Sequence, residues 1–418
     1  MLVGAHMKIL WIARTCPYPA NDGEKIRVFN LLKNLSHHEI TLVFRVMREN
    51  ELEHLSELKK YCQHVEYAHI PSPTSNLTRF RWCLPFIFSK YPVSLCTAFF
   101  PEIAQILRRL CSENTYDIIQ VEHSALTIYL DKLSFLNNPL KIVSMHNIDY
   151  IRNERIYRNQ RFNINKIFNY INQRKYKDWE IGSLNSYDRI ITVSDIDRKM
   201  LLEENRALPV HIIPNGVDIE RYHAVKENID SHVLLFVASM DTDANNDAAI
   251  YFLKSIFPLV KKKCPEARIY LVGRRPGSQL SAHHNNDDII VTGEVPDVMP
   301  YYAKATVTVV PLRSGGGTRL KILEAMAMGS PVVATTIGCE GLNAENNRHL
   351  LIADDPEDFS ACILKLLDDK LTRNRLVSQS RRLVEAQYDW RIIAAAHDDL
   401  YKKAAEHHHG EKSTACNH

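Results

Sequence analysis

The sequence contains no long uninterrupted run of apolar residues. Its most apolar stretch, Cys83 to Phe100, is broken by Lys90 and by two prolines. A membrane-spanning helix needs about 20 predominantly apolar residues, so we expect none. The first residues, Met1 to His6, lack the apolar core of a signal peptide. We therefore expect the first buried strand to begin near Met7, and we interpret the leader as a cloning remnant.

Closely spaced cysteine pairs are also missing. The nine cysteines form no C-x-x-C motif, and no secretory signal accompanies them. This pattern predicts reduced thiols in a cytoplasmic protein, without a metal site. Three histidines at 407–409 lie in a polar tail, which explains them better than metal binding does. The cysteines are Cys16, Cys62, Cys83, Cys96, Cys111, Cys264, Cys339, Cys362 and Cys416.

A strong excess of either charge is absent. With 52 Lys and Arg against 49 Asp and Glu, the formal charge is +3, so nothing indicates a nucleic-acid partner and any cationic surface must be local. Residues 79–88 mix cations with aromatic side chains, which predicts contact with a lipid-linked acceptor or an anionic membrane. Residues 151–180 carry eight Lys or Arg against three Asp or Glu, and a solvated basic helix explains them slightly better.

What the sequence does contain is a repeated alternation of short apolar runs and helical patterns. Its 418 residues, 45% hydrophobic and 24% charged, suit a globular protein of two domains. The alternation predicts an α/β protein with parallel sheets, and the pattern restarts after the Asn-Gly turn at 215–216. We predict two doubly wound domains, with strands at 8–13, 40–46, 118–121, 141–144 and 189–193, then at 233–238, 268–272, 289–292, 306–310, 332–335 and 350–352.

A strand, a glycine loop and a helix follow one another between residues 306 and 333. The glycines Gly315, Gly316 and Gly317 remove every Cβ where the chain must turn sharply or approach a ligand. Thr318 can cap the helix, whose free N–H groups and positive dipole end bind anions such as diphosphates. An ordinary flexible loop is the competing interpretation of the glycines alone.

The side chains that follow the loop favour a negative ligand. Arg319 and Lys321 are cations at the helix end where the dipole disfavours them, so we interpret them as phosphate ligands. Glu324, one turn further, can accept hydrogen bonds from a pair of sugar hydroxyls. A weaker signal is Gly23, which follows the first predicted strand and lets the next helix approach a ligand; without its context, a plain turn is the more common explanation.

Seven short strings occur in order along the chain: Val121–His123, Ser144–Asn147, Ile191–Ser194, Ile212–Asp218, Leu271–Arg274, Val291–Val295 and Gly315–Val333. Together they resemble the retaining GT-B glycosyltransferases of family four (glycosyl transferases group 1). A looser similarity is to sugar transferases of bacterial exopolysaccharide gene clusters. The resemblance covers Met7 to about Lys403.

The resemblance implies two Rossmann-like domains facing a cleft. The first is an acceptor domain at 7–214 and the second a nucleotide-sugar domain at 215–388. A C-terminal helix at 389–405 packs back on the first domain, and a polar tail at 406–418 follows. The implied reaction moves a sugar from a UDP- or GDP-linked donor to a glycan or lipid-linked acceptor, with retention and without a metal or other cofactor. The implied setting is the bacterial cytoplasm, or the inner face of the membrane, in the synthesis of a surface polysaccharide or glycoconjugate.

The resemblance also assigns roles to residues of the second domain. The loop that matches Gly293 to Val295 usually holds the nucleobase, and we include Val295 among the donor-binding residues. The carboxylate that matches Glu324 holds the ribose hydroxyls. The stretch that matches Gly315 to Lys321, helped by the match of Gly23, holds the diphosphate.

The first domain supplies candidates at the ends of two predicted strands. The family match of His123 contacts the transferred sugar or its phosphate, so we predict a catalytic role for His123 together with the two cations of the glycine-loop helix. Glu122, His146 and Asn147 are weaker candidates on the acceptor side. A histidine that satisfies local backbone groups is the competing interpretation of His123 and His146.

Two departures from the family pattern affect the donor site. Gly316 stands where the first glutamate of a Glu-x7-Glu pair is expected, so the identity of the donor sugar is open. The usual Arg and Lys after the first strand of the second domain are absent from residues 237–246. We infer that Arg319 and Lys321, with Arg274 or Arg275, neutralise the phosphates instead. Two other functions stay open, a GT-B sugar-nucleotide epimerase and a non-catalytic nucleotide-sugar binding module.

Overall fold

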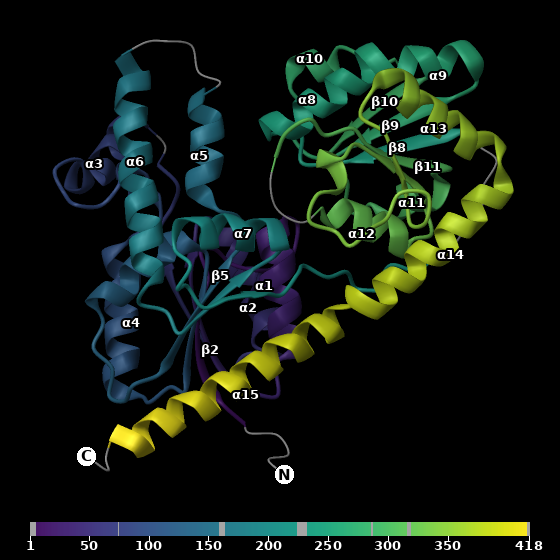
Figure 1. Ribbon diagram of the computed structural model, residues 1–418. Helices are drawn as coiled ribbons and strands as arrows, with labels where there is room; N and C mark the ends of the chain where they lie inside the picture. Colours follow the sequence, from purple (N-terminus) through teal and green to yellow (C-terminus); the bar gives the residue numbers. More distant parts are fainter. Residues whose placement is uncertain are drawn as a thin grey trace. The chain divides into compact units, whose positions relative to one another are not determined.

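The computed structural model describes residues 6–73, 75–158, 164–223, 232–285, 287–315 and 319–415. The chain divides into two compact units. Unit 1 contains the residues up to Pro214 and those from Ala394 onwards, and unit 2 runs from Asn215 to Ile393. Each unit is built on one parallel sheet with helices around it (Figure 1), so the predicted α/β class with two doubly wound domains is confirmed.

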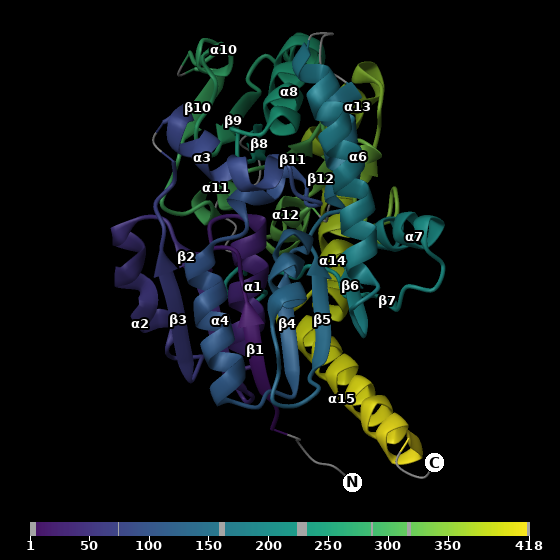
Figure 2. The same ribbon diagram turned by 90° about the vertical axis from the view of Figure 1, so that its left-hand side faces the viewer.

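The sheet of unit 1 has seven strands in the order β3-β2-β1-β4-β5-β6-β7. The strand order reverses between β1 and β4, the place where ligands of doubly wound sheets bind. The central strands are almost wholly buried because helices cover both faces, with α4 on one face and α1 on the other (Figures 1 and 2). The strands are β1 Lys8–Ile12, β2 Glu39–Val46, β3 His64–His69, β4 Ile118–Glu122, β5 Leu140–Met145, β6 Arg189–Thr192 and β7 Val210–Ile212.

The helices of unit 1 connect these strands in the right order for parallel pairing. Asp22 caps the first of them by accepting a hydrogen bond from the backbone N–H of Lys25. The helices are α1 Gly23–Asn34, η1 Glu49–His54, α2 Leu55–Leu58, α3 Asn76–Ile87, η2 Val93–Thr97, α4 Pro101–Glu113, η3 Ser124–Lys132, α5 Asp149–Arg158, α6 Ile164–Leu184 and α7 Asp195–Glu204.

The sheet of unit 2 has six strands in the order β10-β9-β8-β11-β12-β13, which reverses between β8 and β11. The strands are β8 Val233–Val237, β9 Arg268–Val272, β10 Ile289–Gly293, β11 Val307–Val310, β12 Val332–Ala334 and β13 Leu351–Ile352. The helices are α8 Asp243–Tyr251, η4 Phe252–Ile256, α9 Phe257–Lys263, α10 Ser278–Ser281, α11 Met299–Lys304, α12 Leu320–Ala327, η5 Ile337–Cys339, α13 Pro356–Asp368 and α14 Lys370–Gln387.

The last helix, α15 (Trp390–Ala415), begins in unit 2 and continues into unit 1. Within unit 1 its His397 and Tyr401 are buried, and the Tyr401 hydroxyl donates to Gln120 Oε1 on β4 over 3.2 Å. Arg27 on α1 lies beside His397 and also donates to the backbone carbonyls of Ile213 and Pro214. The buried guanidinium of Arg27 therefore contacts both segments through which the chain passes between unit 1 and unit 2.

The structure differs from the sequence-based expectation at two strands and in the C-terminal segment. It adds the strands β3 and β7, whose partly exposed residues lack the continuous apolar pattern on which the prediction relied. The polar segment after Glu406, expected as a tail, is helical as far as Ala415. Across the described ranges, no helix is both long enough and apolar enough to span a bilayer.

Candidate functional site

The cations of unit 2 gather after β8 and β11, at the point where the strand order reverses. Lys321 lies in the first turn of α12, and its Nζ donates to Asn245 Oδ1 on α8 over 3.0 Å. The same ammonium lies 4.8 Å from the ring centroid of Phe236, which belongs to β8. The partners of this half-buried cation are an amide and an aromatic ring, so neither neutralises its charge.

Burial is the main cause that lowers the pKa of Lys321, to about 7, and the positive charge of Arg319 is the second. The nearby Glu324 opposes the shift. A bound anion would favour the protonated ammonium and raise this pKa. Lys321 is therefore placed to respond to a negative ligand.

Arg319 precedes α12 as its N-cap residue, rather than lying in the first turn as expected. Its guanidinium lies against the glycine loop, as shown by the distance of 3.1 Å between Arg319 Nη2 and a Cβ built on Gly315. Gly315 also has a φ of +124°, which L side chains rarely adopt. The other loop residues that we predict to bind the nucleotide-sugar donor are Gly316, Gly317 and Thr318, and they lie outside the described residues.

Glu324 lies one turn after Lys321, beside two tyrosine hydroxyls. Tyr222 donates to its Oε1 over 3.3 Å, and the Tyr302 hydroxyl lies 3.1 Å from its Oε2. Burial raises the pKa of Glu324, although both tyrosines oppose that shift. Since each carboxylate oxygen can accept two hydrogen bonds, the tyrosines orient the group and leave it capacity for ligand hydroxyls.

Two further candidates lie at neighbouring strand ends of unit 2. Arg274, after β9, donates from Nε to the hydroxyl of Ser239 in the loop after β8 over 2.8 Å. The same Nε lies 3.7 Å from the carboxylate of Asp241 in that loop, so Arg274 is a cation that is already paired in part. Val295 follows β10 and packs as a partly buried residue against the core.

The candidates of unit 1 lie around its own switch point, after β1, β4 and β5. Gly23 is the first residue of α1. His123 follows β4 with a φ of +103°, a conformation that costs on the order of 1–3 kcal/mol for a residue with a side chain. Its Nδ1 accepts a hydrogen bond from Ala125 N over 3.1 Å, and its Nε2 lies 3.3 Å from Asp149 Oδ2. Both nitrogens of the buried imidazole thus have partners within unit 1.

The side chains of Glu122 and His146 contact each other. Glu122 is fully buried, and its Oε2 lies 2.9 Å from His146 Nε2, while its Oε1 accepts from the Gln120 amide over 3.0 Å. The rings of His123 and His146 are stacked at a centroid distance of 6.4 Å. Asn147 follows His146 as a half-buried residue. The structure therefore brings Glu122, His123 and His146 into one polar cluster, and Asn147 is the next residue in the chain.

Sequence reasoning missed the buried groups behind this cluster. Asp149 Oδ2 accepts a hydrogen bond from the Tyr176 hydroxyl over 3.1 Å. Glu180 accepts from the Ser124 hydroxyl and from Tyr150 N, and burial, followed by the charge of Asp149, raises the pKa of Glu180 to about 8. The available signal was the spacing of Tyr176 and Glu180, which puts both on one face of α6.

Potential metal ligands gather elsewhere in the described ranges. One group consists of His37, His38 and Asp398, and the other of His232, Cys264 and Glu266. In the first group both imidazoles already lie within 3.0 Å of the Asp398 carboxylate. Neither group includes a residue at the switch points of the two sheets.

Comparison with known families matches both halves of the chain. The model described as Glycosyltransferase Family 4 matches residues 27–221, and the model described as Glycosyl transferases group 1 matches residues 231–369. A protein from Klebsiella pneumoniae, described as an uncharacterized 44.6 kDa protein in the cps region, is 22% identical over 91% of this chain and 96% of its own length. A phosphatidyl-myo-inositol mannosyltransferase of Mycobacterium leprae is 26% identical over 51% of this chain and 59% of its own length.

Solved structures share the fold at low sequence identity. Anabaena Alr3699/HepE, solved in complex with UDP-glucose, superposes with a TM-score of 0.67 at 14% identity, covering 95% of this chain and all of that one. WaaG, a glycosyltransferase involved in lipopolysaccharide biosynthesis, gives a TM-score of 0.64 at 13% identity, covering 93% of this chain and 98% of its own. At such identities the likeness is one of fold.

Proposed function

The chain belongs to the GT-B glycosyltransferases of family 4 and group 1, and from this we propose that it moves a sugar from a UDP- or GDP-linked donor to a glycan or lipid-linked acceptor. Transfer proceeds with retention of the anomeric configuration and without a metal ion. The observation that carries the proposal is Lys321, a half-buried cation with neutral partners at the start of α12. The cps-region relative from Klebsiella pneumoniae supports a role in surface polysaccharide synthesis.

The chemistry explains why cations matter most at this site. In glycosyl transfer the sugar becomes cation-like and the leaving diphosphate gains negative charge, so preorganised positive groups stabilise the transition state more than the ground state. Lys321 and Arg319 supply that charge, with Arg274 on the neighbouring loop. Glu324 binds the ribose hydroxyls, and Val295 lies beside the nucleobase.

In unit 1, the proposed role of His123 is contact with the transferred sugar, and Glu122, His146 and Asn147 lie toward the acceptor. The leaving phosphate takes the proton of the acceptor hydroxyl, so no separate base is needed. In this family a glutamate commonly contacts the sugar, and this chain has Gly316 at that position. The proposed site therefore binds the diphosphate but lacks that contact with the sugar.

A thermal-shift panel of UDP, GDP, ADP and their common sugar conjugates tests the proposal. A ligand present at 100 times its Kd adds about 2.7 kcal/mol of stability, so the matching nucleotide raises the Tm clearly. The matching nucleotide sugar then supports transfer to a glycan acceptor in the presence of a chelator, with retention visible by NMR. Donor conversion without an acceptor would instead indicate an epimerase, and binding without turnover would indicate a non-catalytic module.

We also propose that α3 contacts a membrane or a lipid-linked acceptor. Three of its apolar side chains are exposed, Leu77, Phe80 and Leu84, and Phe88, directly after the helix, is 92% exposed. The cations of Arg79 and Arg81 accompany them, as in helices that lie in the headgroup region. Wild-type protein is expected to sediment with vesicles containing anionic lipid, and the double variant Phe80→Ser/Phe88→Ser is expected to stay in solution. Equal sedimentation of both proteins would remove this assignment.

A further inference from the structure

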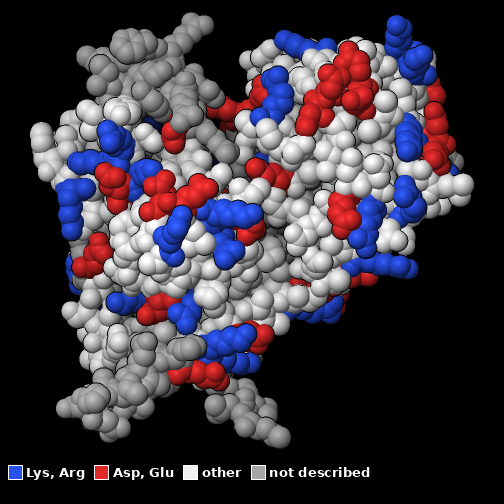
Figure 3. All heavy atoms as spheres, in the orientation of Figure 1, with Lys and Arg blue, Asp and Glu red and all other residues white. Residues whose placement is uncertain are grey.

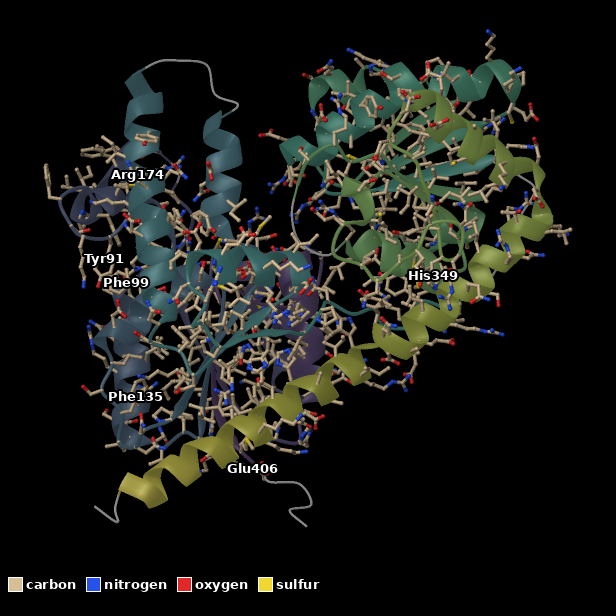
Figure 4. The ribbon with its side chains drawn as sticks, in the orientation of Figure 1. Tyr91, Phe99, Phe135, Arg174, His349 and Glu406 are labelled. Carbon is tan, nitrogen blue, oxygen red and sulfur yellow. The ribbon has the colours of Figure 1, made fainter. Side chains whose placement is uncertain are left out.

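Unit 1 contains a pocket of about 430 Å³ that lies apart from the polar cluster around His123. One wall is a face of α6, formed by residues that recur at helical spacing, Lys175, Asp178, Trp179, Gly182 and Ser183, and continued by Ser186 just after the helix. Tyr176 and Glu180 point from another face of the same helix toward Asp149 and Ser124. The opposite wall is formed by Lys90, Tyr91 and Asp131, and Figure 4 shows Tyr91 beside α6.

The glycine in this wall, Gly182, is not required by close packing against the rest of the protein. Gly182 lies in the last turn of α6, where its carbonyl accepts hydrogen bonds from Asn185, and glycine in a helix loses more conformational freedom on folding than alanine does. A Cβ built on Gly182 would have no heavy atom within 4 Å, so packing against the protein does not require its absence. A ligand that approaches the helix backbone would require it.

The side chains around Gly182 offer both an apolar surface and hydrogen bonds. Trp179 is held in place by an edge-on contact with Tyr176, with ring centroids 5.4 Å apart. Two ammonium groups and two carboxylates complete the lining, so the charges balance and do not favour a phosphate. A saccharide fits this set, because its C–H faces pack on aromatic rings while its hydroxyls donate to carboxylates and accept from ammonium groups.

We infer that this pocket is a saccharide-binding subsite, which holds a segment of the acceptor glycan away from the nucleotide. The pocket volume lies in the usual range of small-molecule sites. The inference deepens the proposed function and rests on it, since a glycosyltransferase with a glycan acceptor is the enzyme that such a subsite serves. Holding one part of the glycan here raises the effective concentration of its reacting end.

An array of defined glucose-, mannose-, galactose- and N-acetylhexosamine-containing oligosaccharides provides the probes, followed by titration of the best binder with tryptophan fluorescence. Wild-type protein is expected to bind at least one oligosaccharide without nucleotide. Gly182→Ala is expected to raise the Tm yet weaken binding at least fivefold. Asp178→Ala, at an exposed position, is expected to weaken binding without changing the Tm, and Asp368→Ala on α13 serves as the matched control.

The outcomes separate this inference from the proposed function. Lys321→Met removes a donor-site cation and is expected to leave oligosaccharide binding unchanged, even if no nucleotide sugar binds to the wild type. Absence of oligosaccharide binding by the wild type would overturn the inference, as would equal affinity of wild type, Gly182→Ala and Asp178→Ala. Displacement of the oligosaccharide by millimolar inorganic phosphate would reassign the pocket to a phosphate group.

Discussion

The carboxyl edges of the two sheets differ in the partners of their ionisable side chains. In unit 1 carboxyl groups lie against imidazoles: Glu122 beside His146, and Asp149 beside His123. In unit 2 Lys321 lies against an amide and an aromatic ring, whereas Arg274 donates to a hydroxyl and lies 3.7 Å from the Asp241 carboxylate. Charges of both signs are interspersed over the face of the molecule in Figure 3, so the contrast is local to the two edges.

The difference shows what each edge is suited to bind. A network whose polar groups already have partners changes little when a neutral, polyhydroxylated acceptor binds, and its cost lies in keeping every group satisfied. A half-buried ammonium whose direct partners are neutral, such as Lys321, gains most from a ligand that brings negative charge. The same type of fold thus provides a neutral side and an anion-binding side.

The largest expected effect comes from removing the cation of unit 2. Lys321→Met should lower kcat/KM for transfer by roughly 10²–10³, by analogy with the loss of one oxyanion-hole donor. Its Tm should stay unchanged or rise, because burial of the ammonium disfavours its charged form. Lys370→Met, at an exposed position on α14, is the control. A Lys321→Met protein with full activity would contradict the contrast between the two edges.

The next largest effect is a pH dependence of stability, expected from Glu180 in the buried polar network of unit 1. Glu180 has a folded pKa of about 8, above the value of an unfolded glutamate. Between about pH 5 and 8 the folded state therefore binds more protons than the unfolded state, and stability falls as the pH rises. The loss should be on the order of 1–3 kcal/mol.

Unfolding by urea at several pH values measures this dependence. Glu180→Gln mimics the neutral form, so its stability should vary less with pH than that of the wild type. Glu406→Gln, at the exposed position labelled in Figure 4, should behave as the wild type does. Parallel curves for the wild type and Glu180→Gln would show that this carboxyl does not titrate in the network.

The pH dependence of donor binding tests the role of Lys321 in unit 2. Above pH 7 the free protein loses the Lys321 proton, and a nucleotide sugar must restore it on binding. The Kd should therefore rise by up to tenfold per pH unit, about 1.4 kcal/mol, between pH 7 and 9. Lys321→Arg keeps its charge throughout this range, so calorimetry should give a flat profile. An equal slope in both proteins would assign the proton to another group.

The smallest effect is expected for a cation that is already paired. Arg313 follows β11 but binds both oxygens of Asp247 and lies 4.4 Å from the ring centroid of Tyr251. Arg313→Ala should change the free energy of unfolding by less than about 1 kcal/mol, as for exposed ion pairs. Donor affinity, measured by calorimetry, should change less than threefold. A loss comparable to that of Lys321→Met would mean that pairing does not distinguish the cations of this edge.

The sequence predicted the parts of the molecule that have a strong periodic signal. The continuous apolar runs identified the six strands of unit 2, and the glycine loop identified the start of α12. Strands β3 and β7 escaped because their exposed residues interrupt the pattern. The candidate residues came from positions after strands, where parallel topology gathers side chains.

Pairing between distant segments could not be predicted in the same way. No spacing in the chain indicates that Glu122 and His146 bind each other or that Tyr222 and Tyr302 orient Glu324. The spacing of Tyr176 and Glu180 puts both on one face of α6 but does not show which residues that face meets. These contacts depend on the register of the sheet and on which face of α6 turns inward. One sequence without its fold specifies neither.

The path of α15 also determines the order in which the protein can be completed during synthesis. Unit 2 is one continuous segment, whereas unit 1 needs residues that are made only after the whole of unit 2. Until these residues arrive, Arg27 lacks its contact with His397 and Gln120 lacks the hydroxyl of Tyr401, so polar groups of unit 1 that are destined for burial stay unsatisfied. The domain that emerges first from the ribosome is therefore the one that finishes folding last.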